Sequence, residues 1–290
     1  MKKTGATLVL AQIAPSLGDI DANLDLHLEA IRRASRSGAD GIVFPELSLT
    51  GYLLQDLVPD CAQQIGSSRV LDALARASRR TAVVAGFVEQ GRGGIHYNSA
   101  VCFVRGEVAH VHRKVYLPTY GMFDEARYFG AGDVIRTFEA PWGRTGILIC
   151  EDFWHVSSSW LLALEGMDTL IVMANSPTKG IDASEGPPGR ETWLSLGRVV
   201  ARFLTTHVVY VNRTGYEDGW NYGGGSYAVS PSGDVTAEGK LLKTDMVTVT
   251  LEPQPLRTTR LAFPVLRDEK IDLVGRELAR IAADRYGKGE

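Results

Sequence analysis

The stretch that most constrains this chain is residues 145–155, where an apolar run ends on a cysteine followed by two acidic residues. The run predicts a buried strand, and Cys150 then stands at the turn that ends it. Serines 157–159 offer N-cap hydroxyls for a following helix, which Gly166 would end. We therefore expect Cys150 on a strand-to-helix elbow, where backbone N–H groups can face a developing negative charge. A buried cysteine that merely fills space is the alternative.

Composition narrows the class of protein. The 290 residues, 44% hydrophobic and 22% charged, can form one large α/β domain or two smaller ones. The formal net charge of −3 and the lack of a Lys/Arg block favour neither nucleic acid nor an anionic membrane surface as partner. We therefore expect a small-molecule partner.

The N-terminal residues and the cysteines indicate the cellular compartment of the protein. The apolar residues after Lys2 and Lys3 are broken by Gln12 and Pro15, so we interpret them as a first strand rather than a signal peptide. No run approaches the roughly 18 apolar residues of a membrane span. Three widely spaced cysteines do not suggest a disulfide framework, and neither a CxxC nor an HExxH pattern suggests a metal. We expect a soluble, cytoplasmic protein without a metal.

The first half of the sequence predicts strand–helix units followed by hairpins. Strands are expected at 6–14, 41–44 and 81–88, helices at 21–37 and 68–80, then antiparallel strands around the turns at 91–94 and 105–107, and a long loop at 114–132.

The second half repeats that order. It predicts a helix near 158–165, a strand at 169–174, a helix at 190–205, a strand at 208–211, and hairpin strands at 226–230 and 247–251 joined by the turn at 231–234. Two such halves predict two mixed sheets packed face to face with helices outside. We expect a main domain over residues 1–252. Residues 253–290, with a helix at 269–285, would form an arm that packs on the body or on a neighbouring subunit.

Two further polar residues lie at strand ends. Glu46 follows the second strand between apolar residues, where a poorly solvated carboxylate suits a general base. Lys114 follows a hairpin strand and precedes Pro118, where a cation could stabilise an anionic nucleophile or an oxyanion. Because parallel strands bring such ends to one rim of a sheet, we expect Glu46, Lys114 and Cys150 to meet.

Three sequence blocks carry a resemblance. Residues 44–47 (FPEL), 112–118 (HRKVYLP) and 149–152 (ICED) are similar, in order, to the three blocks of the nitrilase, or carbon–nitrogen hydrolase, superfamily. Residues 116–129 and 150–154 most closely resemble the glutaminase domain of glutamine-dependent NAD synthetases. The resemblance covers about residues 5–252. It implies a four-layer αββα sandwich with two mixed β-sheets.

The resemblance also implies a Glu46–Lys114–Cys150 triad and no cofactor. The Cys150 thiolate would attack a carboxamide, with Glu46 as base and with Lys114 and the backbone N–H of Glu151 holding the oxyanion. Ammonia would leave and a thioester would be hydrolysed. Glu125 matches a further family glutamate that supports Lys114 and orients substrate. His155, shortly after Cys150, is a weaker alternative partner for the thiol.

The resemblance implies substrate-binding residues as well. Tyr120 and Phe123 match positions that line the pocket, with lid or core packing as the alternative. Ser176 matches a serine that binds the α-carboxylate and amine of glutamine in NAD synthetases. The arginine that should follow it shortly is displaced to Arg190, so Lys179 and Arg190 are the two candidates for this contact.

These observations predict an amidase that hydrolyses a small carboxamide. The alternatives are a glutaminase subunit that supplies ammonia to a separate NAD synthetase, an N-carbamoyl amino acid hydrolase, and a non-catalytic partner subunit. No synthetase loop of the SGGxDS type occurs in the chain. The family and the C-terminal arm imply a homo-oligomer, a dimer or higher.

Overall fold

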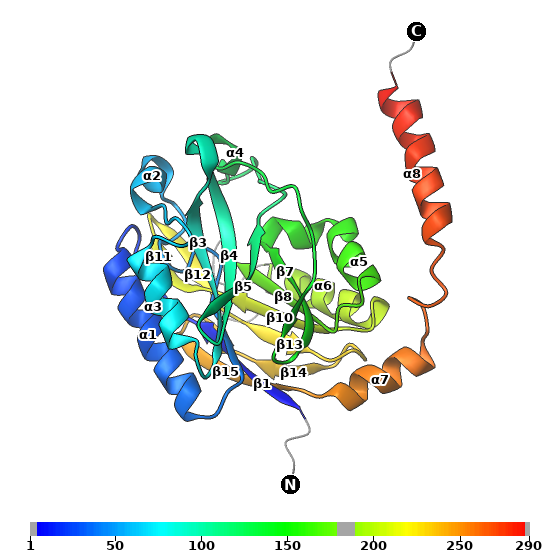
Figure 1. Ribbon diagram of the computed structural model, residues 1–290, viewed down its shortest axis with the longest axis horizontal. Coiled ribbons are helices and arrows are strands. Elements are labelled where there is room, and N and C mark those ends of the chain that lie inside the picture. The colour runs from blue at the N-terminus through cyan, green and yellow to red at the C-terminus, as the bar shows by residue number, and fades with distance from the viewer. Residues whose placement is uncertain (1–4, 179–188, 288–290) are drawn as a thin grey trace.

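The architecture is a sandwich of two six-stranded sheets with helices on both outer faces (Figure 1). The computed structural model describes residues 5–178 and 189–287. The first sheet has the order β15-β1-β2-β3-β4-β5 and the second the order β14-β13-β10-β8-β7-β6. A small third sheet has the order β11-β12-β9. The predicted αββα fold with two mixed sheets is confirmed.

The strands of the first sheet are β1 (Ala6–Gln12), β2 (Gly41–Val43), β3 (Ala82–Gln90), β4 (His96–Val104), β5 (Glu107–Arg113) and β15 (Asp245–Leu251). Those of the second are β6 (Phe138–Ala140), β7 (Gly143–Ile149), β8 (Thr169–Ala174), β10 (His207–Asn212), β13 (Tyr227–Val229) and β14 (Val235–Glu238). The third comprises β9 (Pro177–Thr178), β11 (Thr214–Glu217) and β12 (Trp220–Gly223).

The helices are α1 (Ile20–Arg36), α2 (Val58–Cys61), α3 (Arg69–Ala77), α4 (Glu125–Tyr128), α5 (Val156–Leu164), α6 (Arg190–Phe203), α7 (Pro253–Ala262) and α8 (Ile271–Tyr286). Short 3-10 turns are η1 (Gln55–Leu57), η2 (Arg92–Gly94) and η3 (Cys150–Trp154). Within the described ranges no helix is long and apolar enough to cross a membrane.

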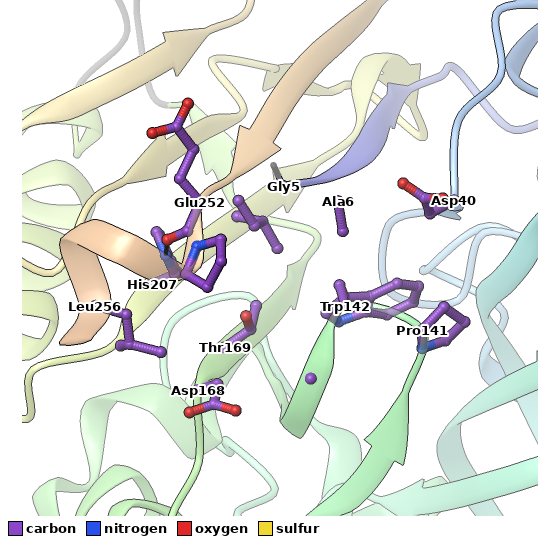
Figure 2. Close-up of a pocket in the computed structure, with 13 residues that line it drawn as sticks. Gly5, Ala6, Asp40, Pro141, Trp142, Asp168, Thr169, His207, Glu252 and Leu256 are labelled. Carbon is purple, nitrogen blue, oxygen red and sulfur yellow. Dashed lines mark hydrogen bonds between the residues drawn. The ribbon is translucent and has the colours of Figure 1, made fainter. Parts of the chain in front are cut away.

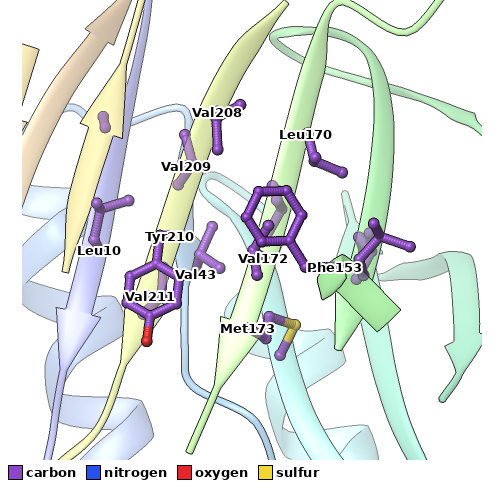
Figure 3. Packing of buried hydrophobic residues seen from close by; sticks show 14 of the residues in the cluster. Leu10, Val43, Phe153, Leu170, Val172, Met173, Val208, Val209, Tyr210 and Val211 are labelled. Atoms are coloured by element: carbon purple, nitrogen blue, oxygen red, sulfur yellow. The ribbon is translucent and has the colours of Figure 1, made fainter. Parts of the chain in front are cut away.

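The alternation of side chains along β1 shows how the layers form. Leu8 and Leu10 face the second sheet, whereas Val9 and Ala11 pack with the apolar residues of α1 and α3. Successive strand residues point to opposite faces, so an all-apolar strand serves two layers. Figure 3 shows the inter-sheet core, where Leu10 and Val43 of the first sheet lie near strands β8 and β10.

The predicted hairpin between residues 226–230 and 247–251 is wrong. Strand β13 pairs with β14, immediately after the turn, and β15 crosses to the first sheet and pairs antiparallel with β1. Val247, Val249 and Leu251 are buried on β15. Their alternating pattern fits any sheet with one buried face, so it did not determine the partner strand.

The C-terminal residues form two helices, of which α7 was not predicted. Pro253 and Pro255 lie in its first turn, where the N–H that proline lacks would have no helical partner. Leu256 is buried, and Arg260 donates a 2.8 Å hydrogen bond to Asp168 at the start of β8. Helix α8 instead projects away from the sandwich (Figure 1).

A cavity of about 380 Å³ lies where β7, β8 and β10 begin and β15 ends (Figure 2). Asp168, Thr169, His207 and Trp142 contribute to its lining. It is at the opposite end of the sandwich from the turn that carries Cys150, because β7 runs from Gly143 at the cavity to Ile149 at that turn.

Candidate active site

Cys150 occupies a strained turn at the end of β7. The residue has a φ of 46°, in the left-handed region that non-glycine residues seldom adopt. It opens the 3-10 turn η3, and helix α5 begins only at Val156. The predicted elbow is therefore present, with an extra 3-10 turn between strand and helix. Cys150 is 8% exposed.

Glu46 follows β2 and is 1% exposed. Its turn lies directly on β3 at Gly86, where an added Cβ would stand 2.4 Å from the Leu47 nitrogen and 2.6 Å from the Pro45 oxygen. Only glycine permits this approach without displacing the backbone. Gly86 therefore helps to set the position of the Glu46 carboxylate.

Lys114 directly follows β5 and joins two buried carboxylates. Its Nζ donates to Glu46 Oε1 at 2.8 Å and to Glu125 Oε1 at 2.7 Å. Burial by itself lowers the pKa of Lys114, but the Glu125 and Glu46 carboxylates outweigh it, so the pKa lies well above its ordinary value. Lys114 is therefore a permanent cation. Among the described residues two acceptors contact Nζ, so one of its three N–H donors is available for a third acceptor.

Glu125 is the first residue of α4 and is also buried. The Tyr52 hydroxyl donates to its Oε1 at 2.5 Å, while Oε2 has no hydrogen-bond partner among the described residues. Burial raises the pKa of Glu125 to about 7, with Lys114 opposing and Glu46 adding to the rise. Glu125 can thus change its protonation state near neutral pH.

The charges of Glu46, Lys114 and Glu125 act on the pKa of the Cys150 thiol. Burial raises the pKa of the thiol well above its ordinary value and Glu46 adds to the rise, whereas Lys114 and the backbone N–H of Asn175 favour the thiolate. The thiol is therefore largely protonated at rest and needs a nearby base to react.

The Glu46 carboxylate is held by two asparagines that the sequence analysis missed. Asn98 of β4 donates its side-chain Nδ2 to Glu46 Oε1 at 2.8 Å. Asn175, directly after β8, donates its backbone N–H to Oε2 at 2.9 Å. The position of Asn175 at the end of an apolar run was a usable signal, whereas Asn98 within a strand gave none.

Asp152 was also missed. It is fully buried and accepts hydrogen bonds from His112 Nε2 at 2.8 Å and from the Val115 and Tyr116 N–H groups at 2.9 Å each. The carboxylate belongs to the Cys150 turn, and its partners flank Lys114. It therefore ties the two segments together.

The prediction that Glu46, Lys114 and Cys150 lie on one rim of a single parallel sheet is wrong. Glu46 follows β2 in the first sheet, Lys114 follows the antiparallel strand β5 of the same sheet, and Cys150 follows β7 in the second. The three residues meet between the ends of two facing sheets. Sheet-on-sheet packing, rather than one parallel rim, brings them together.

Tyr120 and Phe123 lie in the loop before α4. Tyr120 is 58% exposed, and its hydroxyl donates to Glu151 Oε2 at 2.6 Å. Its ring meets that of Phe123 edge to face, with centroids 5.6 Å apart. The loop is thereby joined to the residue after Cys150, and Phe123 also packs against the buried cluster that contains Tyr52 and Phe129.

The two other candidate substrate-binding residues, Ser176 and Arg190, line a small cavity beside α6. Ser176 Oγ accepts from Trp193 Nε1 at 2.8 Å, and Arg190, at the start of α6, pairs with Glu238 of β14. Ser176 and Arg190 line one small cavity with Tyr210. Arg190 thus contacts Glu238 and not the Glu46–Lys114 pair. Lys179 lies outside the described residues.

His155 takes a different role from the alternative considered above. Its ring stacks on Tyr116 with centroids 3.4 Å apart, and its Nε2 lies 3.8 Å from Glu151 Oε1. It packs on the loop after Lys114, and its side-chain contacts within the described residues are with Tyr116 and Glu151 rather than with Cys150.

The sequence model of the family described as carbon–nitrogen hydrolase matches residues 7–261. The chain belongs to this family. The hydrolase is therefore an enzyme that acts on carbon–nitrogen bonds, as predicted. It is 35% identical over 258 residues to a glutamine-dependent NAD(+) synthetase of Thermotoga maritima, covering 87% of this chain and 42% of the synthetase. The hydrolase thus spans less than half the length of that relative.

Solved structures of related proteins have the same fold as this chain. The glutamine-dependent NAD+ synthetase of Acinetobacter baumannii, solved with ADP, superposes with a TM-score of 0.77 at 30% identity over 87% of the hydrolase and 46% of that chain. A carbon–nitrogen hydrolase of Helicobacter pylori G27 has the same fold, with a TM-score of 0.81 at 22% identity over 95% and 98% of the two chains. The predicted resemblance to NAD synthetase glutaminase domains is confirmed.

Proposed function

We propose that this hydrolase is a cysteine-dependent amidase that converts a small, glutamine-like carboxamide to the carboxylate and ammonia through a thioester. One arrangement carries the proposal. The buried Lys114 ammonium donates hydrogen bonds to Glu46 and Glu125. The charges of all three groups act on the pKa of the Cys150 thiol. The arrangement brings a base (Glu46), a cation (Lys114) and a nucleophile (Cys150) into one buried site.

Acylation begins when Glu46 takes the proton of the Cys150 thiol and the sulfur attacks the amide carbon. The carbonyl oxygen becomes an oxyanion, which accepts hydrogen bonds from the remaining N–H of Lys114 and the backbone N–H of Glu151. Protonated Glu46 then gives its proton to the amide nitrogen. The carbon–nitrogen bond breaks, ammonia leaves and a thioester remains.

Deacylation uses the same groups. Glu46 removes a proton from water, the hydroxide attacks the thioester carbon, and the carbon–sulfur bond breaks. The sulfur takes the proton from Glu46, so the thiol and the base return to their starting states. Glu125 Oε2 has no partner in the described part of the chain, while Oε1 already accepts from Tyr52 and Lys114, which supports a role for Oε2 in orienting the substrate amide.

The second candidate is a glutaminase subunit that passes ammonia to a separate NAD synthetase. Similarity to glutamine-dependent NAD synthetases over 87% of the chain supports it. The chemistry at Cys150 would be the same, and only the fate of ammonia would differ.

We also propose the predicted domain division and a homo-oligomer. The apolar side of α8 supports the arm at residues 253–290 as an assembly element, because Ile271, Leu278 and Ile281 are exposed at helical spacing. The free thiols of Cys61, Cys102 and Cys150 support a cytoplasmic location.

Ammonia release tests the proposal. The panel contains glutamine, asparagine, short aliphatic amides, N-carbamoyl amino acids and nitriles, with Cys150→Ala as control. We expect release from at least one carboxamide and none from the variant. Preference for N-carbamoyl compounds would replace the amidase with a carbamoyl hydrolase.

Iodoacetamide labelling provides a second measurement that needs no substrate. Cys102 is fully buried and burial raises its pKa to about 12, so it serves as an internal reference, as does Cys61. We expect Cys150 to react fastest. No ammonia from any compound together with no preference for Cys150 would leave a non-catalytic partner subunit.

The glutaminase alternative has its own test. The hydrolase is mixed with an ammonia-dependent NAD synthetase, an excess of glutamine and an enzyme that scavenges free ammonia. NAD formation that resists the scavenger and is lost in Cys150→Ala supports transfer to a partner. Formation that the scavenger abolishes supports a free-standing amidase.

A further inference from the structure

One buried carboxylate connects the two backbone segments that carry Cys150 and Lys114. Asp152 Oδ1 accepts from the N–H groups of Val115 and Tyr116, each at 2.9 Å. Its Oδ2 accepts from His112 Nε2 at 2.8 Å and from the Ile149 N–H at 3.0 Å. Four donors thus occupy the acceptor sites of the carboxylate, and its residue is 0% exposed.

The partners of Asp152 lie beside the candidate catalytic residues along the chain. Ile149 directly precedes Cys150, and Val115 directly follows Lys114. The Ile149 contact spans the residue whose φ is 46°, so it helps to hold a conformation that needs support from its surroundings. Asp152 therefore fixes the nucleophile's turn and the lysine's loop at once.

We propose that Asp152, oriented by His112, is a positioning residue that determines where the Lys114 ammonium stands relative to the Cys150 sulfur. The inference rests on the proposed function and deepens it. His112 lies on β5, two residues before Lys114, and is 2% exposed. The His112–Asp152 contact therefore joins β5 of the first sheet to the end of β7 in the second.

A purely structural role is the competing explanation, because loss of a buried hydrogen-bonded carboxylate destabilises a protein wherever it lies. The two roles differ in what they do to Cys150. The charged groups that act on its thiol are Glu46, Lys114 and Glu125, and Lys114 is the one of these that favours the thiolate. Displacement of Lys114 should therefore move the titration of the thiol to higher pH.

Asp152→Asn is the sharpest variant, because it keeps the shape of the side chain. On the Oδ1 side its NH₂ would face the Val115 and Tyr116 N–H groups. On the Oδ2 side it would face the Ile149 N–H, and His112 would have to change tautomer to accept from it. His112→Leu removes one donor, whereas His112→Gln can keep an N–H near the position of Nε2. Asp40→Asn is the control away from the site: Asp40, half-buried directly before β2, also accepts from a backbone N–H, that of Thr7 in β1.

The readouts are the pH dependence of Cys150 alkylation by iodoacetamide and the steady-state constants for the best amide. For Asp152→Asn and His112→Leu we expect the alkylation midpoint to rise by about one pH unit. We also expect kcat to fall about 100-fold with little change in KM, as for a misplacement of about 1 Å. His112→Gln and Asp40→Asn should stay close to the unmodified protein in both measurements.

An unchanged midpoint and kcat in folded Asp152→Asn and His112→Leu proteins would overturn the proposal. Should Asp152→Asn not fold, the contrast between His112→Leu and His112→Gln decides. Alkylation needs no substrate, so a shifted midpoint in a protein that hydrolyses no amide would sink the proposed function and leave the positioning role intact. Amide hydrolysis that is insensitive to both Asp152→Asn and His112→Leu would overturn the positioning role and leave the proposed function intact.

Discussion

The hydroxyl of Tyr52 donates a 2.5 Å hydrogen bond to Oε1 of Glu125. Lys114 donates to the same oxygen, and both donors favour the ionised carboxylate, while burial raises the pKa of Glu125 to about 7. Tyr52→Phe removes one of these donors, so the pKa of Glu125 should rise further. More of the carboxyl is then protonated at neutral pH, and its hold on Lys114 weakens.

We expect Tyr52→Phe to lower kcat at pH 7 about 10-fold, the effect of one lost buried hydrogen bond. The acidic limb of the pH profile should move to higher pH. The profile of ammonia release against pH measures both. Tyr216→Phe is the control, because Tyr216 is 74% exposed on β11. A uniform loss of rate with an unmoved limb would contradict the assigned role of Tyr52.

Lys114→Met should unfold more easily and lose activity. The change leaves the buried carboxylates of Glu46 and Glu125 without the cation that contacts both, and breaking such a pair costs about 3–5 kcal/mol. Adding Glu125→Gln removes one of the two carboxylates. The double variant should therefore recover stability in urea unfolding but no activity, and joint recovery of both would exclude Lys114 from the chemistry.

Glu125→Gln should remove a pH dependence of stability. The folded-state pKa of about 7 lies above the ordinary value of 4.5, so folding favours the protonated form. The contribution of this group is fully present below about pH 4.5 and is lost as the pH rises through 7. The stability of Glu125→Gln relative to the unmodified protein should therefore increase across that window. Urea unfolding at several pH values measures the difference, and a constant difference would contradict it.

The sequence predicted those candidate site residues that stand directly after expected strands. Glu46, Lys114 and Cys150 each follow a strand, so the strand pattern and the three family blocks together located them. Asn98 could not be found in this way, because its contact with Glu46 depends on how β4 is placed in the first sheet. Local patterns identify the ends of elements but do not specify which elements become neighbours.

The same limit explains the errors in the fold. Strand β15 was placed beside β13 because the two are close in sequence, although it pairs with β1, more than 230 residues away. Helix α7 was not predicted in the segment that begins with Pro253 and Pro255, although proline is tolerated in the first turn of a helix. The αββα layering, by contrast, followed from the repeated order of elements, which needs no long-range pairing.

The oligomer prediction can be tested on α8. Leu278→Glu with Ile281→Glu places charges on the exposed apolar side of the helix, which should shift the hydrolase towards monomer. Arg276→Glu, on the opposite side of the helix, is the matched control for a charge change. Light scattering coupled to size exclusion at several concentrations measures the mass, and equal masses for all three proteins would rule out this surface as the contact.

Arg190 offers a test of glutamine recognition. Its guanidinium pairs with Glu238 and lines the cavity that contains Ser176, so it can hold a substrate carboxylate only by sharing or leaving that partner. Arg190→Gln should raise KM for glutamine about 10-fold or more, since hydrogen bonds to charged groups contribute about 1.5–3 kcal/mol. KM for butyramide, which has no carboxylate, should stay unchanged.

Glu238→Gln completes the comparison. It removes the competing anion, so Arg190 should bind a carboxylate more readily and KM for glutamine should fall, again without effect on butyramide. Equal responses of the two substrates would mean that Arg190 serves the start of α6 rather than the substrate. Carboxylate recognition would then pass to Lys179, the other candidate, and Lys179→Gln would be expected to show the selective rise in KM that Arg190→Gln had failed to show.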